Sequence, residues 1–326
     1  MNETYDVPVV FLGKDAETAR RLDMAFATIR WDPSYRIRPA FSHPPVEEWA
    51  SALPEKGRAL VLLEVGAAGW ESESSLIETL RARNSRIQVV LVAEDDVDYF
   101  RIAQAFHIGN VIKKGRFDPD ILRALTVRLL TQNIFGFHPY FPNGFAVGPL
   151  HRAYSGKVYV DDAIREAFAF CRPHVPEEEE ANIRMFLHEL LTNTFAYAIE
   201  GITPEDRDSK LLGPPPEVFI PERRGIKVSL ASDAEKVGIS LMDSTGSLSM
   251  LRVLQKLRRQ SKIAGEALPP GVWDESGRGM SLVYRYSRFI VNILSGVRTE
   301  TIFLHYRRKE LNRYESIIIT EVHPGF

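Results

Sequence analysis

The chain has 326 residues, of which 44% are hydrophobic and 26% are charged, with 41 Lys+Arg against 43 Asp+Glu. At about 100–200 residues per domain, this length predicts two domains. The net charge of -2 gives no basis for nucleic acid as a direct partner. Cys171 is the single cysteine, so no disulfide forms within the chain, and we expect a reducing, cytoplasmic location.

The N-terminal residues lack a basic segment followed by an apolar one, so the sequence predicts no secretory signal. The apolar runs are far shorter than the roughly 20 residues that span a bilayer. We therefore expect no membrane span.

Residues 1–131 alternate short β-branched runs with amphipathic stretches, the order that builds a parallel sheet covered by helices. Strands are predicted at Val9–Leu12, Tyr35–Pro39, Ala59–Val65, Ile87–Ala93 and Asn110–Lys113. Helices are predicted at Ala16–Ala27, Val46–Ala52, Glu73–Ala82, Asp98–Phe106 and Asp118–Leu130. We therefore expect an α/β fold with a doubly wound, five-stranded parallel sheet.

Residues 132–150 are dense in Gly, Pro and aromatic side chains. The Gly and Pro content argues against a regular element. A solvated tether would not carry aromatic residues such as Phe137, Tyr140 and Phe141. We interpret the segment as a connector packed between two domains.

Residues 151–310 form the second predicted domain. Its predicted helices are Asp161–Phe170, Glu178–Ala198, Ser247–Gln260 and Gly279–Tyr286, and its predicted strands are Gly225–Leu230, Lys236–Met242, Phe289–Leu294 and Glu300–Tyr306. This mixture favours an α/β sandwich with one helical layer. In the tail, residues 311–326, the run Ser316–Val322 alternates weakly and is a candidate for an edge strand or for pairing with a second subunit, which leaves a homodimer open.

The N-terminal alternation resembles a response-regulator receiver domain over about Asp6–Leu130. That family has an acidic pair after the first strand, then a phosphoacceptor Asp, a hydroxyl and a Lys at the ends of the third, fourth and fifth strands. The corresponding residues here are Gly13, Lys14, Glu64, Val92 and Lys114. With one carboxylate left, the resemblance implies a degenerate receiver that binds no metal and is not phosphorylated.

Glu64 is longer than Asp and can meet Lys114 or Lys14. One hypothesis is that this contact holds a permanently switched or scaffolding state. The alternative is a salt bridge at a strand end without function.

Three motifs follow one another in the second domain. Glu189, Asn193 and Tyr197 form a stripe at four-residue spacing on a predicted helix. The expected apolar face of this helix consists of Ile183, Phe186, Leu187, Leu190, Leu191, Thr194 and Ala198. Asp243 ends a predicted strand at the turn Ser244-Thr-Gly-Ser247, and Gly277 and Gly279 open a predicted helix, where backbone N–H groups favour phosphate.

This ordered set resembles the N, G1 and G2 boxes of GHKL (Bergerat-fold) ATPases, and most closely the anti-sigma factor serine kinases, over about Tyr154–Tyr306. The resemblance implies ATP and Mg²⁺ as cofactors. It implies Glu189 as the general base, Asn193 as a Mg²⁺ ligand and Asp243 as the acceptor of the adenine amino group. The other residues implied to contact the nucleotide are Tyr197, Gly246, Gly277, Arg278, Gly279 and Thr301.

The sequence departs from the family at three places. Thr245 and Ser247 stand where the family has glycines, and Tyr197 stands where the kinases have His. Thr299-Glu300 replaces the usual Gly-Thr, which leaves Thr301 as the expected hydroxyl near the base.

The resemblances together predict a bacterial signalling protein that binds ATP and phosphorylates or sequesters a protein partner, such as a sigma factor or an anti-sigma antagonist. One alternative is a non-catalytic interaction scaffold with a degenerate nucleotide site. A second is an atypical histidine kinase using His188, because His188-Glu-Leu-Leu-Thr192 also resembles a phosphoacceptor box; the helical phase of His188 favours a plain surface residue. The basic residues of Ser247–Lys262 stand where the family has its ATP lid, and a solvated helix face is the alternative there.

Overall fold

The computed structural model describes residues 4–45, 48–66, 70–94, 97–114, 117–198, 217–262, 266–271, 287–308 and 316–323, with the side chains of 70 and 196–198 excepted. The chain is α/β and divides into two compact units. Unit 1 comprises Met1–Asn143, Ile263–Ala267 and Ser316–Thr320, and unit 2 comprises Gly144–Lys262, Leu268–Glu315 and Glu321–Phe326.

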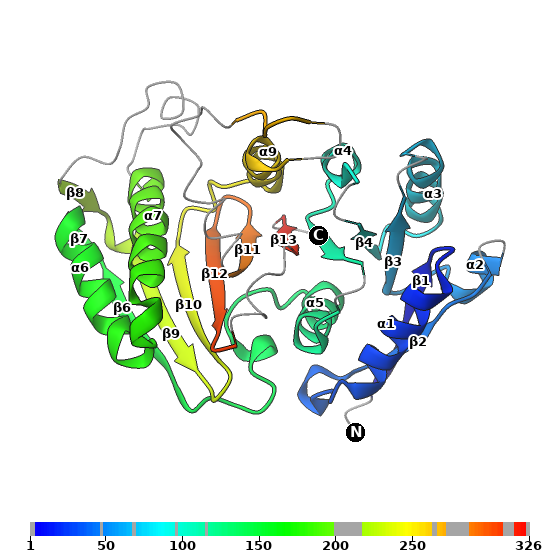
Figure 1. Ribbon diagram of the computed structural model, residues 1–326, viewed down its shortest axis with the longest axis horizontal. Coiled ribbons are helices and arrows are strands. Elements are labelled where there is room, and N and C mark those ends of the chain that lie inside the picture. The colour runs from blue at the N-terminus through cyan, green and yellow to red at the C-terminus, as the bar shows by residue number, and fades with distance from the viewer. Residues whose placement is uncertain are drawn as a thin grey trace. The chain divides into compact units, whose positions relative to one another are not determined.

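Unit 1 alternates strands and helices along the chain (Figure 1). Its strands are β1 (Tyr5–Leu12), β2 (Ile37–Ser42), β3 (Ala59–Val65), β4 (Ile87–Ala93) and β5 (Asn110–Lys113). Its helices are α1 (Ala16–Thr28), α2 (Trp49–Ala52), α3 (Trp70–Arg83), α4 (Tyr99–Ala105) and α5 (Pro119–Thr131). The strands lie in the order β2-β1-β3-β4-β5 and are all parallel.

Helices cover both faces of this sheet, with α1 and α5 on one face and α3 and α4 on the other (Figure 1). The central strands β3 and β4 are therefore buried on both sides, which explains why they read as nearly continuous apolar runs. The five predicted strands form and pair in parallel, and β3, β4 and β5 have the predicted bounds. The expectation of a purely parallel, five-stranded sheet is wrong, because a C-terminal strand pairs antiparallel with β5 and makes the sheet mixed.

The second strand begins later than predicted. Pro33–Tyr35 forms a 3-10 turn, and Arg36 has a positive φ of 54°. A left-handed residue ends the turn, so extended backbone starts at Ile37 rather than Tyr35.

The aromatic segment after α5 packs within unit 1. Phe137, Tyr140 and Phe141 are buried. The Arg128 guanidinium of α5 lies 4.5 Å from the centre of the Tyr140 ring and donates to the Gly136 carbonyl oxygen. The two units meet in sequence at Asn143 and Gly144, inside the segment predicted as the connector.

Unit 2 carries a five-stranded antiparallel sheet, in the order β11-β12-β10-β9-β6, among the residues that the structure describes. The strands are β6 (Val147–Tyr154), β9 (Ile226–Ser232), β10 (Lys236–Asp243), β11 (Arg288–Leu294) and β12 (Arg298–Tyr306). The helices are α6 (Val160–Cys171), α7 (Glu180–Ala198) and α9 (Met250–Gln260). Helices α6 and α7 lie side by side over the sheet (Figure 1).

Three strands of unit 2 were not predicted. β6 is exposed over most of its length because it is the sheet edge, so its sequence has no apolar alternation to reveal it. β7 (Gly156–Tyr159) and β8 (Glu217–Ile220) form a separate two-stranded ribbon that buries only alternate residues.

The tail run forms β13 (Ile317–Val322), which pairs antiparallel with β5 through Ile317 and Ile318 in unit 1. The tail therefore pairs within its own chain. Its first four residues are buried, so β13 does not follow the alternation expected of a half-exposed strand.

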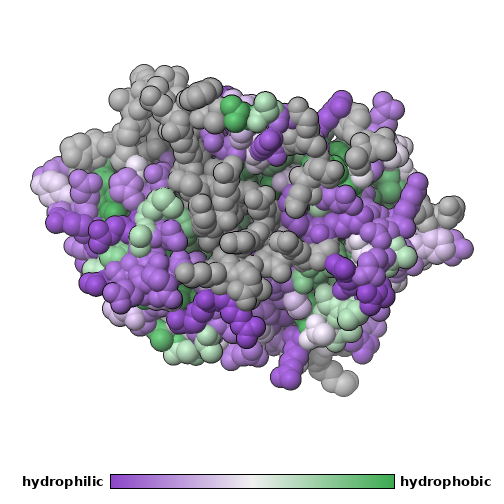
Figure 2. All heavy atoms as spheres, viewed as in Figure 1, coloured by the Kyte–Doolittle hydropathy of each residue, from purple (hydrophilic) through white to green (hydrophobic). Residues whose placement is uncertain are grey.

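No described helix has the length and apolarity to cross a membrane. Where side chains are coloured in Figure 2, hydrophilic residues predominate on the face shown, with small hydrophobic patches between them.

Candidate functional site

The receiver-like residues of unit 1 lie at the carboxyl ends of its parallel strands, which meet at one edge of the sheet. Glu64 is the penultimate residue of β3, and Lys114 follows β5. Two further carboxylates come from the same edge, Asp15 after β1 and Glu94 after β4. Four strands thus deliver one cation and three anions to one place.

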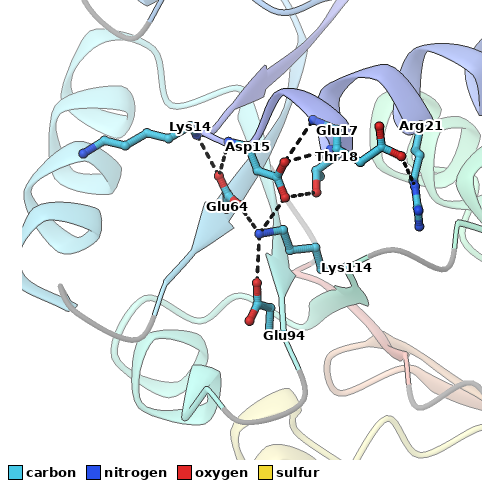
Figure 3. Close-up of polar contacts among 8 residues, drawn as sticks. All are labelled: Lys14, Asp15, Glu17, Thr18, Arg21, Glu64, Glu94 and Lys114. Carbon is cyan, nitrogen blue, oxygen red and sulfur yellow. Dashed lines mark hydrogen bonds and ion pairs between the residues drawn. The ribbon is translucent and has the colours of Figure 1, made fainter.

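Lys114 is the centre of this cluster (Figure 3). Its Nζ lies 2.7 Å from Glu64 Oε1, 2.9 Å from Asp15 Oδ2 and 2.9 Å from Glu94 Oε1. The other Glu64 oxygen accepts hydrogen bonds from the Lys14 and Asp15 backbone N–H groups at 2.7 and 3.2 Å. The Lys14 side chain points away, so Lys14 meets Glu64 through its amide rather than its ammonium (Figure 3).

The expectation of one remaining carboxylate was wrong, because Asp15 and Glu94 also reach Lys114. Asp15 caps the start of α1, where it accepts hydrogen bonds from the Glu17 and Thr18 N–H groups. Its position one residue beyond the expected acidic pair, Gly13 and Lys14, hid it, although a carboxylate soon after a buried strand was a usable signal. Val92 is buried within β4 and supplies no polar group.

The position of the Glu64 side chain explains why residue 13 is a glycine. A Cβ atom at residue 13 would lie 2.5 Å from Glu64 Oε2 and 2.4 Å from Phe11 Cζ. The longer Glu64 side chain therefore occupies the space that an acidic residue at position 13 would need.

The cluster is electrostatically compensated. Burial acts to lower the pKa of Lys114, but its hydrogen bonds to Glu64, Asp15 and Glu94 outweigh burial and raise that pKa. The hydrogen bond from Lys114, helped by Thr18, holds the pKa of Asp15 well below its usual range. Within the described ranges, no group of three His, Cys, Asp or Glu side chains is arranged to hold a metal ion. The arrangement is a fixed ion-pair cluster.

In unit 2, α7 carries the first of the three motifs named from the sequence. Glu189 and Asn193 are half-exposed, and His188 is exposed. The core face of α7 differs from the prediction at one position: Phe195 is fully buried against the Tyr154 ring, whereas Thr194 is half-exposed.

Helix α7 runs antiparallel to β12. Just before α7 begins, Glu179 Oε2 lies 3.4 Å from His305 Nε2. Further along α7, the Phe186 ring lies 5.6 Å from the Phe303 ring. Asn193 is two turns beyond Phe186, about 10 Å along the helix. Thr299 is about 13 Å beyond Phe303 along the strand. Asn193 therefore lies beyond Phe186 in the direction in which β12 runs back toward Thr301 and Thr299.

Asp243 is directly opposite Thr299 in the pairing of β10 with β12, and Thr301 is opposite Leu241. Because side chains alternate along a strand, Asp243, Thr299 and Thr301 share the face that also presents Phe303 to α7. Asp243 and helix α7 therefore lie on the same side of the sheet.

The Asp243 carboxylate is buried, with 8% of the residue exposed. Burial raises its pKa, although the Thr245 hydroxyl and backbone N–H donate to it and oppose the shift. Beside it, the buried Thr299 hydroxyl has no hydrogen-bond partner among the described residues. A buried hydroxyl of this kind next to a carboxylate fits the donor and acceptor groups of an adenine ring.

Thr299 was read from the sequence as part of a lost Gly-Thr motif, and Thr301 was expected to supply the hydroxyl. The strand register puts Thr299 beside Asp243, which the sequence could not establish without the pairing of β10 and β12.

Gly246 has a structural reason to be glycine. Its φ is 57°, and a Cβ atom there would lie 2.4 Å from both Leu294 O and Val297 N. The close approach that excludes a side chain is to the turn between β11 and β12.

The remaining predicted nucleotide contacts lie outside the described residues. These are Gly277, Arg278, Gly279 and the side chain of Tyr197, together with the predicted helix Gly279–Tyr286. Cys171 is buried, which raises the pKa of its thiol to about 12, so it is not a reactive nucleophile.

No protein-family model matches this sequence, and no curated protein matches it either. The resemblances to receivers and GHKL ATPases rest on the residues quoted above.

Proposed function

We propose that unit 2 binds Mg-ATP and phosphorylates or sequesters a protein partner, and that unit 1 is a receiver-like domain that controls it without being phosphorylated. The observation that carries the proposal is the buried pair of Asp243 and Thr299 on adjacent strands, on the face covered by α7. The order of the three motifs adds support, because it is the order in GHKL ATPases.

Each motif residue would have a separate role in binding or phosphoryl transfer. Asp243 and Thr299 would hold the adenine ring, and the Asn193 amide oxygen would bind Mg²⁺, a cation that prefers oxygen ligands. ATP would supply the phosphoryl group. Glu189 is half-exposed on α7 and would accept the proton of a Ser or Thr hydroxyl of the partner.

Unit 1 would control this activity without acquiring a phosphoryl group. Its Glu64 carboxylate is already bonded to Lys114 and to two backbone N–H groups, so it is a poor nucleophile for a phosphoryl donor. The cluster supports a domain held in one state.

Calorimetry with Mg-ATP tests nucleotide binding. Replacing Asp243 by Asn removes a buried, charged acceptor, so we expect Asp243→Asn to weaken binding by about 10- to 100-fold. The matched control is Asp161→Asn, an exposed residue in the first turn of α6, which we expect to bind like the wild type. Equal affinities of wild type and Asp243→Asn would contradict the assigned adenine site.

Transfer of the γ-phosphoryl group from labelled ATP to candidate partners tests the enzyme proposal. We expect Glu189→Gln to retain nucleotide binding and to slow transfer by about 10²- to 10⁴-fold, and His188→Ala to leave transfer unchanged. Binding by the wild type without any transfer would favour a sequestering module. Loss of transfer in His188→Ala would favour a histidine kinase.

A further inference from the structure

One carboxylate of the C-terminal strand joins two segments of unit 2. Glu321 Oε2 accepts a hydrogen bond from the Met250 backbone N–H at 3.0 Å, and Oε1 accepts one from the Ser295 hydroxyl at 2.7 Å. Met250 is the first residue of α9, and Ser295 directly follows β11. The Glu321 side chain therefore connects the start of α9 to the turn between β11 and β12.

The same turn holds the loop that follows Asp243. The Gly296 N–H donates to the Gly246 carbonyl oxygen at 3.0 Å, and the Ser295 N–H donates to the Val322 carbonyl oxygen at 3.0 Å. These bonds link three segments, residues 243–250, 294–299 and 321–322. The first contains Asp243 and the second contains Thr299, so the linked segments carry both residues of the proposed adenine site.

Glu321 also meets a local requirement of α9. The first N–H groups of a helix lack partners within the helix, and a negative charge near them is favourable. Ser249 caps the helix by accepting from Arg252 N, while Glu321 takes the N–H of Met250. A purely stabilising role would therefore lower the melting temperature without changing how the site binds nucleotide.

We propose that Glu321 is a positioning residue for the nucleotide site: it holds the start of α9 and the β11–β12 turn together and so fixes the loop that follows Asp243 relative to Thr299. This inference rests on the proposed function. Glu321 lies outside Tyr154–Tyr306, the stretch that resembles GHKL ATPases, so the resemblance assigns it no role.

The test compares Mg-ATP affinity, by calorimetry, with hydrogen exchange of the Met250 amide in the full chain. We expect Glu321→Gln to weaken Mg-ATP binding by about tenfold, since it alters hydrogen bonds to a charged acceptor, and to speed exchange at Met250. The control Glu235→Gln removes the same charge from an exposed turn residue and should change neither quantity.

A second variant, Ser295→Ala, deletes only one of the two Glu321 bonds and keeps the inference testable if Glu321→Gln does not fold. Because the two residues act through one contact, we expect their effects on affinity to be less than additive in the double variant. Faster exchange at Met250 with unchanged affinity would overturn the positioning role and leave the proposed function standing. If the wild type binds no Mg-ATP, the positioning role and the proposed function are both overturned. The wild-type measurement by itself distinguishes this outcome from failure of the positioning role alone.

Discussion

At the scale of single residues, the two candidate sites differ in how their charges are balanced. In unit 1, the Lys114 ammonium lies between 2.7 and 2.9 Å from one oxygen of each of three carboxylates. In unit 2, the buried Asp243 has neutral Thr245 donors, and burial raises its pKa. The first arrangement stabilises the fold, whereas the second costs stability and is typical of binding sites.

Replacing Lys114 by Met would leave Asp15, Glu64 and Glu94 close together without their cation. We expect Lys114→Met to lower the free energy of unfolding by about 2 kcal/mol, measured by urea denaturation at neutral pH. Lys14→Met is the control, because the Lys14 ammonium points away from the cluster (Figure 3). Equal stability of the two variants would contradict the central role of Lys114.

Replacing Asp243 by Asn should stabilise the protein at neutral pH. The folded state raises the pKa of Asp243 above its ordinary value of 3.8, so the folded chain binds more protons and loses stability as pH rises through that window. Asn carries no charge and still accepts from Thr245. We expect a higher melting temperature for Asp243→Asn at neutral pH.

The stability advantage of Asp243→Asn over the wild type should depend on pH. Below the ordinary pKa of 3.8, Asp243 is protonated in both states, so the advantage of Asp243→Asn should vanish. Thermal melts between acid and neutral pH check this. A melting temperature that is lower for Asp243→Asn at neutral pH would show that the carboxylate stabilises the fold instead.

At the scale of elements, the strands of unit 1 whose bounds the sequence predicted are those buried on both faces. β3, β4 and β5 have the predicted bounds because their apolar runs are continuous. β6 was missed because an exposed edge strand needs no apolar residues, and its partner β9 supplies the pairing. β13 shows a different limit: its apolar run was visible in the sequence, but its pairing with β5 joins residues about 200 positions apart in the chain.

The pairing of β13 within unit 1 requires a residue without a side chain at position 109. Ile319 N donates to Gly109 O at 2.8 Å, and a Cβ atom on Gly109 would lie 2.1 Å from the Ile319 carbonyl oxygen. We expect Gly109→Ala to destabilise the protein by about 1–3 kcal/mol in urea denaturation, because backbone must move. Gly66→Ala, where a Cβ would meet nothing within 4 Å, should be close to neutral.

At the scale of the whole molecule, the chain combines a unit with an ion-pair cluster at its strand ends and a unit with a buried carboxylate and hydroxyl, for which we propose a nucleotide ligand. Each unit has its own paired strands and its own buried apolar residues. This difference in chemistry is the reason why we propose that unit 2 binds nucleotide and that unit 1 controls it.

The first domain should not accept a phosphoryl group. We expect the full chain, incubated with acetyl phosphate and Mg²⁺, to show no added phosphoryl mass by intact-mass spectrometry, because Glu64 and Asp15 are both bonded to Lys114. A phosphorylated wild type that becomes unreactive as Glu64→Gln would refute the degenerate-receiver interpretation. Asp23→Asn, which alters an exposed carboxylate of α1, is the control.

The sequence by itself determined the α/β class, the parallel order of unit 1 and most of its element bounds, because hydrophobic periodicity is a local property of the chain. It also named Glu64, Lys114 and Asp243, each next to a strand end. Only the tertiary structure brought in Asp15, Glu94, Thr299 and Glu321, because their roles depend on strand register and on contacts between distant segments. Local pattern sets which elements form, and only pairing between strands decides which side chains meet.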